Sequence, residues 1–558
     1  MQKANFTFRS SFAKAVVSLL ILLYYNSCKP LGLNNPCDPK SESYLSTLLL
    51  SSRSETPIPL CGFRVGNSPK LWEAQAYLKA SNADAGDFFG TSVAISGDTI
   101  VVGAAGEASN QTTITNGSTA SSDNSASFTG AVYVFQRSGS IWVQEAYLKA
   151  PNSELDDRFG VSVGISGDTI VVGAIFEDSN QITITNGPNA SINNTLSNSG
   201  AAYVFQRSGS SWTQQAYLKP TNTGVDDQFG ISVAISGDTI AVGAFLEDSN
   251  QTSITNGSSA SIDNSALNAG AVYVFQRTGT AWVEQAYLKA SNAQTEDRFG
   301  ISVAISGDTI VAGANLEDSN QTTITNGGVA SSNNSASISG AAYVFQRTGS
   351  AWAEQAYLKA PNGEANDQFG EDVAIDGDRI VVGAFSESSN QITITNGTTA
   401  SGDNSANLAG AAYVFQRTGS AWSNQAYLKA PNTGADDRFG IALAIEGDTI
   451  LVGAIFEDSN MTTITNGASA SEDNSSSNSG AVYVFQKRGS DWVHNAYLKA
   501  PNADADDRFG NSVSISGDTI IVSANQEDSN QNTITNGPTA SANNAALSAG
   551  AAYVFLRK

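Results

Sequence analysis

The sequence predicts an all-β protein whose chain forms a seven-bladed propeller, a closed ring of four-stranded blades. A unit recurs seven times without insertion or deletion, and its copies begin at residues 71, 141, 211, 281, 351, 421 and 491. Every copy holds four short stretches rich in β-branched and aromatic residues, and the chain shows no long amphipathic helical pattern. Repetition of such a unit is typical of propellers and solenoids.

The second copy illustrates the four strands expected in each blade. The two middle stretches are apolar on both faces, as in sheets that are covered on both sides. Gly-Asp and Ser-Gly-Ser sequences separate the stretches and are typical of tight turns. The expected strands are residues 142–150, 159–166, 168–174 and 200–207.

The two ends of the array decide between a propeller and a solenoid. A solenoid needs polar caps on its terminal repeats, and neither the first nor the last copy has one. Residues 72–80 form a strand-like stretch that precedes the first Phe-Gly pair and has no blade of its own. The last copy ends at residues 551–557, just before the position at which a stretch of this kind would follow. Their pairing would complete the seventh blade and remove an open sheet edge. We therefore expect a closed, monomeric propeller over residues 71–558.

Charge limits the partners of this chain. Its 558 residues carry a formal net charge of −23. A surface this negative repels the phosphate backbone of nucleic acids, which excludes them as partners. Cations, basic proteins and neutral glycans remain compatible with the charge.

The N-terminus predicts export. Residues 1–14 contain three basic residues and no acidic one, and residues 15–25 are apolar but too short to span a bilayer. The segment up to Cys28 resembles a bacterial lipoprotein signal of the relaxed spirochaete kind, with Ser27 before the cysteine. This resemblance implies lipidation of Cys28 and attachment to the cell envelope, at the outer membrane or cell surface. The alternative is an ordinary signal peptide cut nearby.

A short tether is expected between the signal and the array, over residues 29–70. Its two cysteines, Cys37 and Cys61, would form one disulfide in an exported protein. Asp38 followed by Pro39 is typical of a helix start.

Alternating Phe-Gly and Gly-Ala pairs mark the copies. They resemble the FG-GAP repeats of the integrin α-subunit head, a seven-bladed propeller, and are similar to bacterial surface proteins built from these repeats. The Phe-Gly pairs are Phe89-Gly90, Phe159-Gly160, Phe229-Gly230, Phe299-Gly300, Phe369-Gly370, Phe439-Gly440 and Phe509-Gly510. The Gly-Ala pairs begin at Gly103, Gly173, Gly243, Gly313, Gly383 and Gly453, and the seventh copy has Ser523-Ala524.

One departure from the integrin pattern concerns calcium. Integrin blades 4–7 carry an Asp-rich calcium loop between the Phe-Gly strand and the Gly-Ala strand. Here that connection is only Ser166–Asp168 or its equivalent. The resemblance therefore implies no calcium site in these turns.

Long loops are expected on a single face of the propeller. Successive hairpins of a blade emerge on opposite faces, and the short turns share one of them. The other face receives the connection before each Phe-Gly pair and a polar excursion such as residues 175–200. Loops that a rigid scaffold gathers in this way commonly carry binding residues.

Two acidic columns on this face are candidate calcium ligands. One is the Asp two residues before each Phe-Gly pair, and the other is the Glu after each Gly-Ala pair. The second and seventh copies also space oxygen ligands alternately, as calcium sites do. The candidates are Asn152, Glu154, Asp156, Asp157, Glu177, Asp178, Asn502, Asp504, Asp506, Asp507, Glu527 and Asp528. The favoured alternative is that these side chains cap backbone N–H groups in turns.

Other candidate features favour structural roles. One tryptophan per copy could stack on sugars, but packing between blades is favoured. The Thr-Ile-Thr-Asn-Gly segment of each excursion predicts a small extra hairpin. His494, the one histidine, is expected on the surface. Ser162 matches a nucleophile-elbow pattern, but it lies within a strand and has no histidine to activate it.

These observations favour a binding module for adhesion or assembly, with a protein or glycan ligand on the loop face. A carboxylate-based hydrolase or lyase is one alternative. It predicts one blade with non-repeating polar residues at the channel, and the seven copies indicate no such blade. A structural spacer of the envelope is the other alternative. The fold alone does not decide among them.

Overall fold

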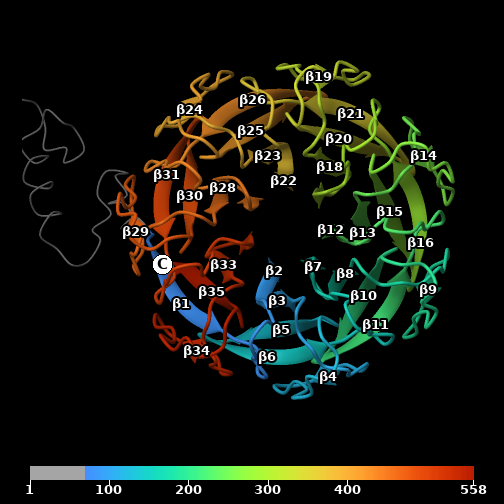
Figure 1. Ribbon diagram of the computed structural model, residues 1–558, viewed down its shortest axis with the longest axis vertical. Coiled ribbons are helices and arrows are strands. Elements are labelled where there is room, and N and C mark those ends of the chain that lie inside the picture. Colours follow the sequence, from blue (N-terminus) through green and yellow to red (C-terminus); the bar gives the residue numbers. More distant parts are fainter. Residues whose placement is uncertain (1–69) are drawn as a thin grey trace, which may run out of the picture. The chain divides into compact units, whose positions relative to one another are not determined.

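Seven antiparallel sheets of five strands each surround a central channel, and each sheet is one blade (Figure 1). The computed structural model describes residues 70–558. The predicted signal, Cys28, the Cys37–Cys61 disulfide and the tether up to residue 69 lie outside the described residues. Trp72–Lys558 forms one compact unit. Within the described part of the chain, no helix is long and apolar enough to cross a membrane.

The two inner strands of each blade come from the Phe-Gly and Gly-Ala stretches. The innermost strands of blades 1 to 7 are β2 (Phe89–Ser96), β7 (Val163–Ser166), β12 (Val233–Ser236), β17 (Val303–Ser306), β22 (Phe369–Asp376), β27 (Leu443–Glu446) and β32 (Val513–Ser516). The second strands are β3 (Thr99–Ala104), β8 (Thr169–Ala174), β13 (Thr239–Ala244), β18 (Thr309–Ala314), β23 (Arg379–Ala384), β28 (Thr449–Ala454) and β33 (Thr519–Ala524).

The next two strands complete the expected four. The third strands are β5 (Ala131–Ser138), β10 (Ala201–Ser208), β15 (Ala271–Thr278), β20 (Ala341–Thr348), β25 (Ala411–Thr418), β30 (Ala481–Arg488) and β35 (Ala551–Arg557). The fourth strands are β6 (Ile141–Leu148), β11 (Ser211–Leu218), β16 (Ala281–Leu288), β21 (Ala351–Leu358), β26 (Ala421–Leu428), β31 (Asp491–Leu498) and β1 (Trp72–Leu78).

A fifth, outermost strand corrects the sequence prediction. The expected extra hairpin does not form; its Thr-Asn pair instead binds the outer edge of the fourth strand, as in Thr115↔Tyr147 and Asn116↔Ala146. A two-stranded hairpin is marginally stable alone, whereas addition to an existing sheet also covers the edge of that sheet. The fifth strands are β4 (Thr115–Asn116), β9 (Thr185–Asn186), β14 (Thr255–Asn256), β19 (Thr325–Asn326), β24 (Thr395–Asn396), β29 (Thr465–Asn466) and β34 (Thr535–Asn536).

The hydrophobic core lies between blades. In β8, Ile170 and Val172 pack in the cluster shared with blade 1, whereas Val171 packs in the cluster shared with blade 3. The strand is therefore apolar on both faces because each face meets another blade. Phe159 does not begin a strand as expected but forms a parallel bridge with Gly130 of blade 1.

Ring closure confirms the predicted pairing of the two chain ends. β1 lies antiparallel to β35, with Tyr77 opposite Tyr553 and Leu78 opposite Ala552. The first described strand (blue) thus lies beside the last (red) in Figure 1. Blade 7 takes one strand from the start of the array and four from its end.

An asparagine of each fifth strand ties its blade to the next. Asn116 accepts a hydrogen bond from Trp212 N (2.7 Å) and donates one to Trp212 O (3.2 Å), as a backbone partner would. The same bonds recur around the ring and cross the closure, where Asn466 binds Trp72. All seven tryptophans are at most 2% exposed. Their predicted packing between blades is confirmed, and their faces are not available for sugar stacking.

Deletion of Trp72–Leu78 should destabilise the propeller strongly, because it uncovers the edge of β35. Loss of buried Trp72, Tyr77 and Leu78 should alone cost about 5 kcal/mol, at roughly 1.5–3 kcal/mol per large apolar side chain. Thermal unfolding measures the effect. Removal of residues 1–69 is the control and should leave the melting temperature unchanged, since it leaves all these strands in place. Equal melting temperatures for the two truncations would contradict closure.

Candidate functional site

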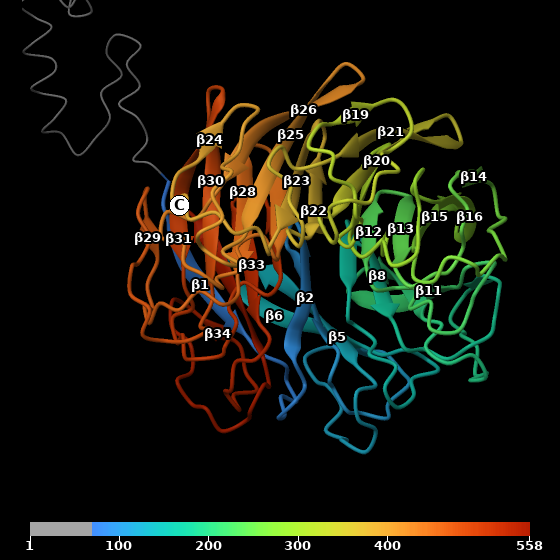
Figure 2. The same ribbon diagram turned by 45° about the horizontal axis from the view of Figure 1, so that its top comes forward.

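The long connections gather at one end of the blades, here called the loop face. In blade 2, residues 149–158 lead into the innermost strand and residues 175–200 connect the second and third strands. Figure 2 shows such loops extending beyond the strands and over the outer edge. Backbone bonds join the loops of neighbouring blades, as in Asp156 N to Ser127 O (3.1 Å) and Arg158 N to Phe128 O (2.9 Å). The loop face is thus tied together around the ring.

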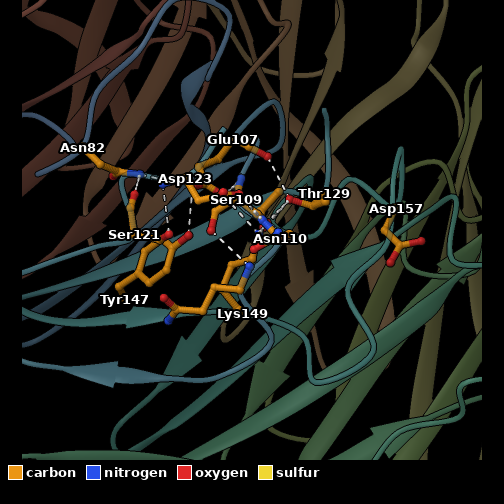
Figure 3. A network of polar contacts seen from close by, with 12 residues as sticks. Asn82, Glu107, Ser109, Asn110, Ser121, Asp123, Thr129, Tyr147, Lys149 and Asp157 are labelled. Carbon is orange, nitrogen blue, oxygen red and sulfur yellow. Dashed lines mark hydrogen bonds and ion pairs between the residues drawn. The ribbon is translucent and has the colours of Figure 1, made fainter. Parts of the chain in front are cut away.

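A buried ion pair occupies the loop-face end of every blade. Figure 3 shows the pair of blade 1. In blade 1, Glu107 accepts hydrogen bonds from Tyr147 Oη (2.8 Å), Lys149 Nζ (3.0 Å) and Asn82 Nδ2 (3.1 Å). Ser109 N also donates to it at 3.2 Å. The lysines of these pairs, which sequence reasoning did not single out, are Lys79, Lys149, Lys219, Lys289, Lys359, Lys429 and Lys499.

Two predicted metal ligands, Glu177 and Glu527, belong to these ion pairs. Glu177 lies 3.2 Å from Lys219 and Glu527 lies 2.9 Å from Lys79. An ammonium at this distance repels a divalent cation. Burial lowers the pKa of Lys219, opposed by Glu177, and burial also raises the pKa of Glu177. Because both charges are buried, removal of one partner alone costs about 3–5 kcal/mol.

The Asp column caps the turns that precede the Phe-Gly pairs. Asp157 Oδ2 accepts a hydrogen bond from Glu154 N (2.7 Å), and Asp507 Oδ2 accepts one from Asp504 N (2.8 Å). These bonds are the ones expected from turn capping. Burial raises the pKa of Asp157 from 3.8 to about 8, against the lowering effect of the backbone hydrogen bond.

The remaining predicted ligands in blade 2 also bond to the protein. Asn152 Nδ2 binds Ser191 O (2.8 Å), and Asp178 Oδ1 accepts a bond from Asn198 N (2.7 Å). Glu154, which bonds Asn194, and Asp156 are exposed.

Blade 7 repeats this arrangement. Asn502 binds Ser541 O (2.7 Å) and Asp528 accepts a bond from Ser548 N (2.7 Å). Asp504 and Asp506 are exposed and accept bonds from asparagines of neighbouring loops. Within residues 70–558, no group of three or more His, Cys, Asp and Glu side chains could hold a metal ion. Calcium binding stays a prediction.

The central channel reveals a blade that differs from the rest. It is a cavity of about 260 Å³ lined by the residues that follow each Phe-Gly pair. Most of these residues are Val, Ile, Ser or Thr; blade 6 has Ala442, blade 7 has Asn511, and blade 5 has the two acidic residues of the lining, Glu371 and Asp372. The expectation that no blade carries non-repeating polar residues at the channel was wrong. The sequence pattern does not single out these two residues, because only the closed ring shows which side chains line the channel.

Asp372 has a structural role in blade 5. Its two carboxylate oxygens accept hydrogen bonds from Val373 N (2.9 Å) and from Leu443 N of blade 6 (2.7 Å). In blade 2 the equivalent Ser162 donates instead to Gly230 O (2.7 Å). Burial raises the pKa of Asp372 to about 7. Ser162 is therefore a blade-to-blade contact too, and not an elbow nucleophile.

Glu371 is held differently. Its Oε2 accepts a bond from Asn315 Nδ2 (2.6 Å) at the end of β18, and Oε1 has no hydrogen-bond partner among residues 70–558. The Oδ1 atom of Asn315 is buried and also has no partner there. Burial raises the pKa of Glu371, whereas the Asn315 bond and the charges of Arg298 and Arg438 lower it.

His494 corrects a smaller prediction. It is partly buried in the outer part of blade 6, and its ring lies 5.5 Å from that of Phe485 and 5.9 Å from that of Tyr483. Burial lowers its pKa to about 4. His494 is thus an uncharged packing residue near neutral pH, and not a surface residue as expected.

The model of the FG-GAP repeat family matches the sequence seven times. The matched residues are 72–135, 142–205, 212–275, 282–345, 352–415, 422–485 and 492–555. The chain belongs to the FG-GAP repeat family. Each match runs from the tryptophan of one copy to the phenylalanine that ends its Tyr-Val-Phe stretch.

Two further comparisons concern curated proteins and solved structures. No curated protein matches this FG-GAP repeat chain. One similar solved structure is an acylaminoacyl peptidase in complex with Z-Gly-Gly-Phe-chloromethyl ketone, 9% identical, with a TM-score of 0.35, covering 81% of this chain and 50% of that one. Another is a puromycin-hydrolyzing peptidase of Mycobacterium tuberculosis, 9% identical, with a TM-score of 0.38, covering 86% and 58%. The chain thus spans between half and three fifths of each peptidase.

The Asp157→Asn variant should change how stability depends on pH. Between about pH 4 and pH 8 the folded state keeps a proton on Asp157 that the unfolded state loses, so the unfolding free energy of the wild type falls as pH rises. Asparagine removes this contribution. Relative to wild type, the variant should gain about 1–3 kcal/mol between pH 5 and pH 9, measured by denaturant unfolding.

The matched control is Asp156→Asn, which removes the same charge from the exposed neighbouring side chain. Its stability difference from wild type should stay nearly constant over the same pH range. A parallel shift for both variants would argue against a buried, protonated Asp157.

Proposed function

We propose that this protein is an exported, lipid-anchored FG-GAP propeller that binds a partner protein through its loop face, in adhesion or in assembly of the cell envelope. The proposal rests on one observation. The four most exposed large apolar side chains of the described residues are all on the loop face: Ile262 (88% exposed), Ile192 (85%), Val329 (74%) and Leu547 (71%).

The positions of these side chains follow from the backbone contacts around them. Ser191 O and Ser261 O, next to Ile192 and Ile262, accept bonds from the connections that enter the innermost strands. Leu547 O accepts a bond from Gly86 N of blade 1 (2.9 Å). Apolar side chains held out from a rigid ring are suited to burial in an interface. Aliphatic groups favour a protein partner over a glycan, which would use exposed aromatic rings.

The hydrolase alternative is less well supported. Glycosidase chemistry needs two carboxylates free to act on the substrate. Blade 5 has two carboxylates at the channel, but both oxygens of Asp372 are bound to backbone N–H groups. Glu371 is then a single available carboxylate, which suits binding better than hydrolysis.

A binding screen tests the loop-face proposal. The purified chain is screened against extracellular-matrix and envelope proteins and a glycan array, with and without EDTA. We expect saturable binding to a protein, weakened about tenfold or more by the double variant Ile192→Asp, Ile262→Asp. The matched control places the same charges in tight turns of the opposite face, Ser210→Asp with Thr280→Asp, and should bind as wild type. No binding would support the spacer alternative, and loss on EDTA treatment would support calcium.

The anchor is tested separately. We expect the full chain, produced in a bacterium that lipidates exported cysteines, to partition into detergent and the membrane fraction. Cys28→Ser should move it to the aqueous fraction, because one acyl-bearing cysteine is the expected attachment. Cys37→Ser is the control and should leave partitioning unchanged. A Cys28→Ser chain that stays with the membrane would contradict lipidation at this residue.

A further inference from the structure

Seven of the eight Asn-Gly pairs in the sequence lie at the junctions between blades; the eighth is Asn362-Gly363 in a loop of blade 5. Asparagine deamidates most readily before glycine, because no side chain hinders attack by the glycine N atom on the asparagine Cγ atom. All seven asparagines are exposed, so water reaches them. The seven pairs are Asn116-Gly117, Asn186-Gly187, Asn256-Gly257, Asn326-Gly327, Asn396-Gly397, Asn466-Gly467 and Asn536-Gly537.

Hydrogen bonds engage both reacting groups of each pair. In blade 2, the Asn186 side chain binds Trp282 N (2.7 Å) and Trp282 O (3.1 Å) of the next blade. Gly187 N donates to Gln215 O of the fourth strand (2.7 Å). Deamidation requires the side chain to turn towards the glycine N atom and that atom to lose its proton, so both sets of bonds oppose it. The exposed asparagine is thus protected by its blade contacts and not by burial.

Two of the seven pairs depend on β1 for this protection. Asn466 binds Trp72 N (2.8 Å) and Trp72 O (3.1 Å), and Gly537 N donates to Gln75 O (2.7 Å). A cavity of about 900 Å³ brings the two pairs to one place, since its lining includes Trp72, Gln75, Asn466, Asn536 and Gly537. Release of β1 would therefore free one reacting group at each pair, the side chain of Asn466 and the N atom of Gly537.

β1 is held in blade 7 by non-covalent contacts alone. In blades 1 to 6 a two-residue turn links the third strand to the fourth, as residues 139–140 do between β5 and β6. β35 and β1 have no such link, because they span residues 551–557 and 72–78. β1 can separate from β35 and β34 while the other blades stay folded, and such local opening requires less free energy than global unfolding.

We propose that Asn466 and Asn536 are sites of spontaneous deamidation, and that the docking of β1 controls their reaction. The glycine N atom forms a bond to Cγ of the asparagine, and the side-chain nitrogen leaves as ammonia. The product is a cyclic imide, which water opens to aspartate or isoaspartate. Water is the one co-reactant, and no oxidation or reduction takes place. This proposal does not depend on the binding partner of the loop face.

The product weakens the contact that protects the asparagine. Aspartate at position 466 cannot donate the hydrogen bond to Trp72 O, and its carboxylate lies against that carbonyl oxygen, which carries a partial negative charge. Isoaspartate also lengthens the backbone within the short fifth strand. Reaction at Asn466 thus favours release of β1, which frees Gly537 N and accelerates reaction at Asn536.

Peptide mapping by mass spectrometry of the full chain, kept folded in mildly alkaline buffer, tests the proposal. The chain supplies matched reference sites, since Asn186 shares the sequence Thr-Ile-Thr-Asn-Gly-Pro with Asn536, and Asn116 shares Thr-Thr-Ile-Thr-Asn-Gly with Asn466. We expect Asn466 and Asn536 to deamidate at least about tenfold faster than their references. In the denatured chain each site should react within about twofold of its reference, because no blade contact remains.

Two results of this mapping would overturn the proposal. One is equal rates at the four sites of the folded protein. The other is no reaction at Asn466 and Asn536 over a period in which the denatured chain reacts.

A variant of β1 tests its control of both sites. Leu78→Ala removes a fully buried side chain of β1 and alters neither Asn-Gly pair. It should raise the rates at Asn466 and Asn536 about tenfold or more, because it favours the open state. The matched control is Leu288→Ala in β16, which a turn links to β15, and it should change these rates less than about twofold. Unchanged rates in Leu78→Ala, or an equal rise in Leu288→Ala, would overturn control by β1.

The coupling between the two sites has its own test. Asn466→Asp copies the deamidated product and should raise the rate at Asn536 about fivefold or more. Asn256→Asp makes the same exchange at the junction with Trp352 and should leave that rate within about twofold of wild type. A wild-type rate at Asn536 in the Asn466→Asp variant would overturn the coupling through β1.

Discussion

The contact between neighbouring blades is the interaction on which the whole structure depends. Each blade is apolar on both faces, so no blade can bury its core residues without a neighbour on each side. A linear stack would leave two such faces in water, whereas a ring leaves none. The pairing of β1 with β35 is therefore essential, because it makes the last blade as complete as the others.

Polar side chains reinforce the same contact. The asparagine of each fifth strand binds the tryptophan backbone of the next blade, and serines near the channel bind glycine carbonyls of the next blade. At the loop face, the buried Lys–Glu pairs join the ends of strands within each blade. These recurring networks account for most of the conspicuous polar columns in the repeats. Residues that differ from one copy to the next are therefore a better indication of specific recognition than residues that recur in every copy.

The exposed aliphatic side chains of the loop face are one such departure from the repeat. These side chains differ from copy to copy. Rigid backbone bonds between neighbouring loops favour such recognition, because little order has to be created on binding.

The sequence by itself determined the number of blades, four strands of each, the closure of the ring and the packing of the tryptophans, because these depend on local patterns and exact repetition. Only the tertiary structure decided the rest. Glu177 and Lys219 stand 42 residues apart, and their pairing depends on which strand of the next copy completes the blade. The fifth strand of each blade likewise forms only because the fourth strand leaves an open edge to which it can bind. Asp372 and Leu443 belong to different copies, and they bond because ring geometry, which no single repeat contains, brings the innermost strands of neighbouring blades together.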